Sequence, residues 1–333
     1  MAITVENNHI KIRGSEFVSH ECEMSRIPVL YSTLHRIAKT VRQPTVEIFF
    51  SDGEPISAMN VQYMLDGIIH LLGITRDHLV IGTHDRDFNY PGARIDHISS
   101  PGLVSAIDCL DPWPNPTHAT DAKRFGATFG RFSIDRLVLA AHLGTLLREK
   151  SFLIFNPARD WVDAQLQDLK NYYAHEMAWY DSWTNPHSDL TPNAAGSVCH
   201  YGRLNLTPYL HIWPRYHIEI VAETNIHSPY FVTEKTTRCL LTRKPFVLYG
   251  ARGSLAHLRE LGFRTFQGSI DESYDDISDN WQRLDCVKHE ITRLGSLNDR
   301  EHQQMLTDLD DVLRFNQDNY KRIARNYFYD FPH

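Results

Sequence analysis

The sequence lacks the features of membrane and fibrous proteins. None of its 333 residues belongs to an apolar run of about 18 or more, so no membrane-spanning helix is expected. Its 17 glycines and 16 prolines are too few for a collagen-like or low-complexity chain. The first residues carry no apolar signal core, and no C-x-x-C pair occurs among Cys22, Cys109, Cys199, Cys239 and Cys286. We therefore expect reduced thiols and a cytoplasmic protein.

Several motifs of nucleotide, metal and nucleophile sites are also absent. No two glycines have G-x-G spacing and no Gly-Lys pair occurs, which disfavours a dinucleotide fingerprint and a P-loop. His175-Glu176 does not continue into H-E-x-x-H, and none of the 19 histidines shows zinc-ligand spacing with a cysteine. No G-x-S-x-G elbow is present. These absences disfavour a nicotinamide dehydrogenase, a P-loop enzyme, a zinc enzyme and a Rossmann-type hydrolase.

The sequence has fewer basic than acidic residues. With 34 Lys and Arg residues against 41 Asp and Glu residues, the formal net charge is −7. Such a chain has no global field that attracts nucleic acid or an anionic membrane surface. Residues 235–264 are locally basic, however, so a basic cleft on an acidic protein stays open as an alternative.

The first third of the chain shows a β-α-β pattern. Residues 45–50 and 79–82 are apolar runs typical of buried strands, and the apolar positions of residues 57–72 form one helical stripe. This pattern predicts the start of a parallel sheet. Residues 111–122 contain three prolines and little periodicity, which favours a linker between domains; the alternative is a surface loop within one domain.

A second alternating series follows and predicts another sheet. Its helices include one capped by Ser133 and one that ends before Gly262, a residue in the usual position for a helix C-terminus. The whole pattern predicts an α/β protein with two doubly wound units. The expected strands are 125–129, 151–155, 218–222 and 245–249, and the expected helices are 133–148, 159–180, 233–243, 254–261, 276–294 and 298–328.

The segment from 218 to 266 carries the most chemistry. A buried strand ends at Glu223, and Thr233 opens a helix with Glu234 and Lys235 in its first turn. A lysine is electrostatically unfavourable beside the N-terminus of its own helix, a cost that an anion bound there would offset. A second strand ends at a glycine-rich turn that contains Arg252. We expect these two turns to meet at the carboxyl edge of the sheet and to hold a pyrophosphate. The Glu223 or Glu234 carboxylate would accept hydrogen bonds from ribose or sugar hydroxyls.

These residues also resemble a known family. Tyr230-Phe-Val-Thr-Glu-Lys-Thr, then Lys-Pro-Phe-Val-Leu-Tyr-Gly and Leu-Gly-Phe-Arg-Thr-Phe, resemble the C-terminal half of GT-B-type glycosyltransferases. The first motif is similar to the V-T-E-K segment of the α1,3-fucosyltransferase family. The order of the three motifs, with Asp271-Glu-Ser-Tyr-Asp275 after them, also resembles uncharacterised bacterial and phage proteins. The resemblance covers residues 215–275, and residues 1–120 show none.

The resemblance implies a GT-B-like fold, in which two Rossmann-type doubly wound domains face a cleft. Residues 1–115 would form the acceptor-side domain and residues 123–315 the donor domain. Residues 316–333 would form a C-terminal helix that returns to the N-terminal domain.

The resemblance also implies a donor site. Glu234 and Lys235 would hold the ribose or diphosphate of a UDP- or GDP-linked sugar, and Arg131 or Arg136 would neutralise the departing diphosphate. The residues themselves add Glu223, Thr233 and Arg252 to this donor site. Members of the family use helix dipoles and basic side chains for this purpose and generally no metal. After T-E-K this chain departs from the fucosyltransferase spacing, so the identity of the donor does not carry over.

An inverting enzyme further needs a base on the acceptor side. Asp52 and Glu54 follow one strand of the first domain, and Asp85 follows the next, so each is a candidate catalytic base. Turn residues of these types are common, and the alternative is a purely structural role.

The aromatic side chains between residues 172 and 183 allow two interpretations. They could stack on a sugar ring or a flipped base, or they could belong to a core. The cluster consists of Tyr172, Tyr173, Trp179, Tyr180 and Trp183.

The function expected from the resemblance is transfer of a sugar from a nucleotide-diphospho donor to an acceptor hydroxyl. The acceptor is a saccharide, a protein or, as in phage-type DNA modification, a modified base. The alternative is a non-catalytic module that binds a nucleotide or polyanion with a GT-B-like fold.

Overall fold

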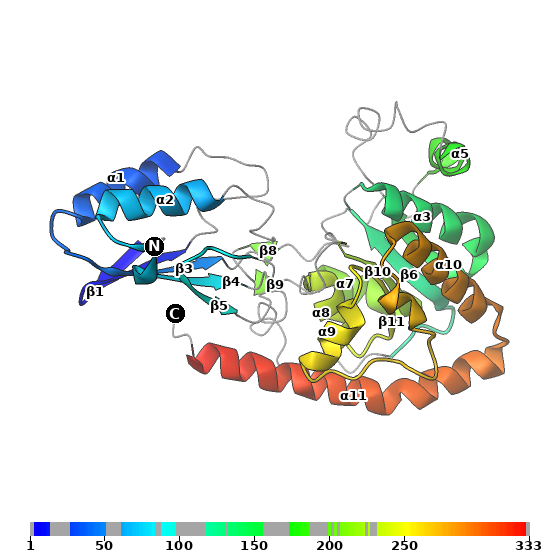
Figure 1. Ribbon diagram of the computed structural model, residues 1–333. Helices are drawn as coiled ribbons and strands as arrows, with labels where there is room; N and C mark the ends of the chain where they lie inside the picture. Colours follow the sequence, from blue (N-terminus) through cyan, green and yellow to red (C-terminus); the bar gives the residue numbers. More distant parts are fainter. Residues whose placement is uncertain are drawn as a thin grey trace. The chain divides into compact units, whose positions relative to one another are not determined.

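The computed structural model describes two compact units. One comprises Met1–Gly102 with Tyr230–Val232, and the other comprises Leu103–Pro229 with Thr233–His333. Each contains a mixed arrangement of helices and parallel strands, consistent with a Rossmann-like α/β fold (Figure 1). The described residues are 3–13, 27–50, 61–83, 88–97, 117–130, 132–155, 173–184, 186, 199–200, 203–204, 207–223, 226 and 232–330.

The first unit contains a sheet of order β1-β2-β3-β4-β5. Its first two strands form an antiparallel hairpin whose turn residues, Asn7 and Asn8, have φ of 46° and 66°. Asparagine tolerates this left-handed conformation, which a two-residue hairpin turn requires. The other strand pairs are parallel. The strands are β1 (Ile3–Glu6), β2 (His9–Arg13), β3 (Thr45–Phe50), β4 (Leu79–Thr83) and β5 (Arg94–His97).

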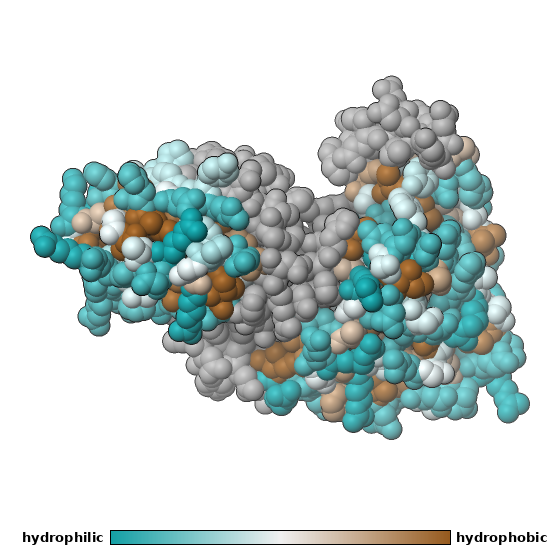
Figure 2. All heavy atoms as spheres, in the orientation of Figure 1, coloured by the Kyte–Doolittle hydropathy of each residue, from teal (hydrophilic) through white to brown (hydrophobic). Residues whose placement is uncertain are grey.

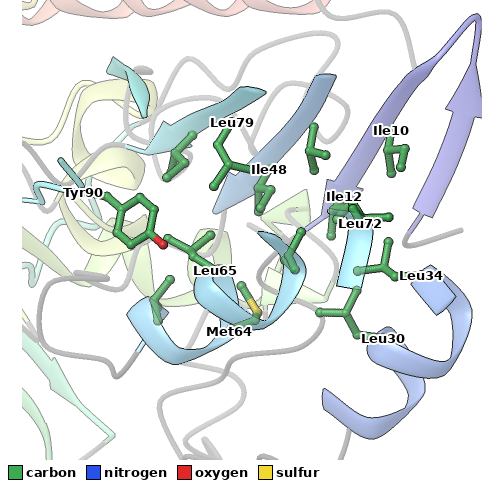
Figure 3. Close-up of a cluster of buried hydrophobic side chains, with 14 of the residues drawn as sticks. Ile10, Ile12, Leu30, Leu34, Ile48, Met64, Leu65, Leu72, Leu79 and Tyr90 are labelled. Carbon is green, nitrogen blue, oxygen red and sulfur yellow. The ribbon is translucent and has the colours of Figure 1, made fainter. Parts of the chain in front are cut away.

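Helices α1 (Ile27–Ile37) and α2 (Val61–Leu72) both cover the same face of this sheet (Figures 1 and 3). Strands β2 to β5 are neighbours in chain order, and right-handed crossovers that step in one direction place their helices on one face. The order does not reverse, so the described strands of this unit form no doubly wound sheet, contrary to the prediction. The core lies between the two layers and includes Ile10, Ile12, Leu30, Leu34, Ile48, Met64, Leu65 and Leu79.

The second unit contains a parallel sheet of order β11-β10-β6-β7. From β6 (Lys123–Phe129) the chain passes through α3 (Ile134–Leu146) to β7 (Ser151–Phe155) on one side. It later returns to the other side of β6 as β10 (Tyr216–Ala222), and then β11 (Phe246–Tyr249). The order therefore reverses between β6 and β10, the kind of switch point at which α/β sheets bind ligands.

The remaining predicted helices of the second unit agree with the structure where it describes them, whereas the elements at 199–200, 203–204 and 207–212 were not predicted. Gly262 has φ of 85°, as its predicted place beyond a helix end requires. The first part of the predicted helix 159–180 and residues 111–116 of the predicted linker 111–122 lie outside the described residues. The other elements are α5 (Ala174–Ser182), β8 (Cys199–His200), β9 (Arg203–Leu204), α7 (Thr207–Ile212), α8 (Glu234–Leu241), α9 (Ser254–Glu260), α10 (Asn280–Ser296) and α11 (Asp299–Asp330).

Helix α11 runs without interruption past residue 316, where the sequence placed a domain boundary. The Asn316 side chain donates to the Arg264 carbonyl at 2.7 Å, and that of Gln317 donates to the Leu241 carbonyl at 2.6 Å. This part of the helix therefore packs within the second unit. Side chains after Ile323 lie outside the description, and their packing on the N-terminal domain stays a prediction.

The described part of the aromatic cluster belongs mostly to the core of the second unit, and Tyr172 lies outside the described residues. The rings of Trp179 and Tyr180 are buried and contact Phe155, with centroids 5.7 and 5.8 Å apart. The Trp183 indole donates to the Phe155 carbonyl at 2.9 Å. Tyr173 differs, because its ring lies 5.6 Å from that of Trp281.

A buried ion pair joins α8 to the sheet. Arg238 Nη2 lies 2.6 Å from Glu219 Oε1 on β10 and also donates to Thr128 Oγ1 on β6 at 2.6 Å. The hydroxyls of Tyr209 and Tyr216 both donate to the other oxygen of Glu219. Every partner is buried, so the two charges compensate each other inside the protein.

We expect Arg238→Met to lower the free energy of unfolding by about 3–5 kcal/mol, because it leaves the Glu219 carboxylate buried without its cation. Urea unfolding followed by circular dichroism measures this. Arg314→Ala, which breaks an exposed pair with Asp310, is the control and should leave stability unchanged. If the double variant Arg238→Met, Glu219→Met is no more stable than Arg238→Met alone, the loss does not come from the orphaned charge.

Two histidines connect α11 to β10. His217 Nδ1 and His302 Nε2 are 2.9 Å apart, so one ring donates a proton and the other accepts it. Burial, followed by nearby positive charges that include Arg124, lowers the pKa of each to about 4. In the unfolded chain these histidines become protonated below about pH 6.5, whereas in the folded chain they stay neutral until the pH falls to about 4.

We expect the second unit to be fully stable above pH 6.5 and to lose roughly 1–2 kcal/mol per histidine between pH 7 and pH 5. Thermal melting at the two pH values measures this. His302→Gln should reduce the difference between them, whereas His289→Gln, at an exposed position of α10, should not. An unchanged difference in His302→Gln would contradict the assignment.

Candidate functional site

The Glu223 carboxylate organises the carboxyl end of β10. It accepts hydrogen bonds from the Thr233 amide at 3.2 Å, the Thr233 hydroxyl at 2.5 Å and the Thr236 hydroxyl at 2.6 Å. Thr233 is the N-cap of α8, and its hydroxyl accepts the Lys235 amide at 3.3 Å. One buried carboxylate thus fixes the start of α8 beside the end of β10.

Lys235 lies in this cluster with its ammonium group held by three oxygens. Its Nζ is 3.0 Å from Thr233 Oγ1, 3.1 Å from Glu234 Oε1 and 3.8 Å from Glu223 Oε2. Burial is the largest single influence on Glu234 and would raise its pKa, but the Lys235 charge, the hydrogen bond from Lys235 and the Arg238 charge together hold the pKa below its usual value. The Lys235 side chain keeps 16% of its surface exposed, so a ligand could reach it.

The two turns that the sequence singled out lie next to each other. The Glu223 amide donates to the Tyr249 carbonyl at 2.9 Å, which aligns the ends of β10 and β11. A Cβ atom placed on Gly250 would lie 3.8 Å from Glu223 Cγ and 2.9 Å from Ser254 Oγ. The lack of a side chain at Gly250 therefore leaves room for the Ser254 hydroxyl, and the Glu223 side chain lies at ordinary contact distance from the turn after β11.

Arg136 also reaches this edge of the sheet, from the first turn of α3. Its Nη2 donates to the Ala222 carbonyl at 3.0 Å, and the side chain is buried. Since α3 follows β6, this contact bridges the two strands on either side of the switch point. Arg136 holds the end of β10 in place and does not present its charge to solvent.

The start of α9 differs from the expected phosphate seat. The amides of Leu255 and Ala256 donate to the Asp275 carboxylate at 3.0 and 2.9 Å. Burial raises the pKa of Asp275 above its usual value despite these bonds. The protein supplies its own carboxylate here, so an anion bound near this turn would depend on the exposed Arg252 guanidinium and not on these amides.

Arg252 lines an open hollow at the same end of the second unit. The hollow has a volume of about 410 Å³. Its other lining residues come from the start of α10 and from the segment after β10, and they are Ile226, Ser278, Asp279, Asn280 and Trp281.

The structure thus brings together Arg136, Glu223, Thr233, Glu234 and Lys235. Arg252 follows the adjoining turn. The other candidates lie outside the described residues, so their roles stay predictions: the catalytic candidates Asp52, Glu54 and Asp85, and the donor-site candidate Arg131.

Sequence reasoning missed three residues that shape this region. Thr236 lies one position beyond the T-E-K motif, and Asp275 ends the D-E-S-Y-D segment. Their place in or next to these motifs was therefore a signal that could have identified both. Arg283, buried on α10, donates to the Gly250 carbonyl at 3.0 Å. No local pattern distinguishes that arginine from an exposed one, because its partner is 33 residues away.

The chain matches no protein-family model and no curated protein. Among the described residues, no group of three or more His, Cys, Asp or Glu side chains is placed to hold a metal ion. No helix in the described ranges has the length and apolar character needed to span a membrane. Figure 2 shows hydrophobic residues interspersed with hydrophilic ones on the visible face, as is ordinary for a protein surface.

We expect Glu223→Gln to lower the free energy of unfolding by about 1–3 kcal/mol, because an amide cannot accept all three hydrogen bonds and loses the Lys235 charge contact. Urea unfolding measures the change. Glu149→Gln, at an exposed position, is the matched control and should behave as the unsubstituted protein. Equal stability of the two variants would show that Glu223 does not organise the cluster.

Proposed function

We propose that the chain is a glycosyltransferase that moves a sugar from a nucleotide-diphospho donor to an acceptor hydroxyl without a metal. The observation that carries this proposal is the position of Lys235. Its ammonium group is held by Glu223 at the end of β10, beside the strand-order reversal where α/β sheets bind ligands. The resemblance of the T-E-K segment to the donor half of GT-B enzymes supports the same assignment.

The charges at this edge suit the departure of a diphosphate. Cleavage of the bond to the anomeric carbon builds negative charge on the leaving group and positive charge on the sugar. The Lys235 ammonium and the Arg252 guanidinium supply positive charge for the leaving group, and Glu234 supplies an acceptor for ribose hydroxyls. Glu223 acts as a positioning residue because it holds Lys235 and the start of α8.

The proposal places the acceptor side in the first unit, with Asp52, Glu54 or Asp85 as the base that deprotonates the acceptor hydroxyl. The donor is UDP- or GDP-linked, and the acceptor is a saccharide, a protein or a modified base of DNA. The GT-B arrangement, with the two units facing a cleft and the C-terminal helix returning to the first, is part of the proposal.

A second candidate is a module that binds a nucleotide or polyanion without transfer. The occupation of the α9 amides by Asp275 favours it, because those amides cannot also stabilise a developing diphosphate. Turnover separates the two candidates.

We expect Lys235→Met to reduce the consumption of UDP- or GDP-linked sugars about 10²–10³-fold, the usual effect of removing one preorganised charge from a transition state. Hydrolysis or transfer is followed by chromatography of the released nucleotide. Lys288→Met, which breaks a surface contact with Asp285 at 2.8 Å, is the matched control and should retain full activity.

Thermal-shift measurements with UDP and GDP separate binding from chemistry. Stabilisation by a nucleotide without consumption of any nucleotide sugar would support the binding module and contradict the enzyme. Neither stabilisation nor consumption across UDP-, GDP- and ADP-linked sugars would contradict both.

A further inference from the structure

Trp281 is an exposed aromatic residue that lines the same hollow as Arg252. It lies in the first turn of α10 and keeps 46% of its surface exposed. Its ring is 5.6 Å from that of Tyr173, with 35° between the ring planes, so one side of the indole has an aromatic neighbour. Large exposed apolar groups in a concave site are characteristic of ligand contact.

The buried Arg283 side chain holds together residues that line this hollow or lie next to its lining. Its guanidinium donates to the carbonyls of Gly250 at 3.0 Å, Ile277 at 2.6 Å and Ile226 at 3.5 Å. A fourth bond goes to the side chain of Asn280 at 2.5 Å. One arginine therefore holds the turn before Arg252, the Ile226 carbonyl and the start of α10 in a single arrangement, which lowers the cost of ordering them on binding.

The groups in the hollow select the chemistry of a ligand. Arg252 is exposed and lines the hollow, so its guanidinium can contact an anion there. The indole of Trp281 offers a flat face to a ring, and the volume of about 410 Å³ suits a small molecule. A nucleoside phosphate has both a planar ring and an anion, whereas a neutral sugar lacks the charge and inorganic phosphate lacks the ring.

We propose that Trp281 stacks against the nucleobase of a nucleoside phosphate whose phosphate group contacts Arg252. The inference rests on the proposed function and extends it, because it assigns the base of the donor to the start of α10. Stacking is tolerant of base identity, so both UDP and GDP should use this platform.

The test is isothermal titration of GDP, UDP and ribose 5-phosphate into the full chain and its variants. Trp281→Leu should weaken GDP and UDP binding about 10-fold or more, whereas Trp281→Phe, which keeps a flat ring, should stay within about 3-fold. Ribose 5-phosphate has no base, so Trp281→Leu should leave its binding unchanged. Arg252→Ala should weaken all three ligands.

Two control variants match these substitutions. Tyr63→Leu removes an aromatic residue that is 72% exposed in the first unit, and Arg300→Ala removes an exposed arginine of α11. Both should bind all ligands as the unsubstituted chain does. Thermal melting of each variant shows whether it is folded.

The outcomes separate the inference from the proposed function. If Trp281→Leu binds GDP and UDP normally while nucleotide sugars are still consumed, the stacking platform is wrong and the proposed function stands. If Trp281→Leu weakens ribose 5-phosphate as much as GDP, the residue acts through the fold and the inference is also overturned. If the unsubstituted chain binds no nucleotide and consumes no nucleotide sugar, both proposals fail.

Discussion

The buried pair between Arg238 and Glu219 is the constraint on which the second unit depends. A charge inside a protein is tolerated only when a partner and hydrogen bonds compensate it, so α8 has one acceptable position against β10. Lys235 lies one turn before Arg238 on that helix, and Glu223 lies on the same side of β10 as Glu219, four residues on. The pair that secures the core therefore also brings Lys235 to Glu223.

Carboxylates of the protein itself shape the ligand edge of the sheet. The Glu223 carboxylate accepts a hydrogen bond from the amide of Thr233, the N-cap of α8, and the Asp275 carboxylate accepts hydrogen bonds from two amides of α9. Sites built on glycine-rich loops bind phosphate with free amides, but here those donors are satisfied internally. We therefore expect the side chains of Lys235 and Arg252 to recognise an anion. The position of Lys235 depends on Glu223, and that of Arg252 depends on the turn that Arg283 holds.

Local patterns were reliable where one element decided them. The apolar run at residues 151–155 is strand β7, and Gly262 adopts the conformation that a helix end requires. Ser133 occupies the N-cap position of α3 as predicted, but its hydroxyl makes no capping hydrogen bond. The hairpin at Asn7 and Asn8 was missed, although two asparagines between alternating apolar residues are a turn signal. The one-sided helix layer of the first unit was also missed, because the order of strands in a sheet depends on pairing between strands that are distant in sequence and no single element indicates it.

The sequence by itself determined β3, β4 and the four strands of the second sheet, most helices of the second unit, the candidate donor residues and the expectation that they meet at strand ends, since periodicity, capping and turn chemistry are local. Only the tertiary structure decided which charges are buried and which face a ligand. Arg136, Arg238, Arg252 and Arg283 look alike along the chain, yet three are buried and one is exposed. That difference comes from partners distant in sequence, because the energy of a charged group depends on what the fold packs around it.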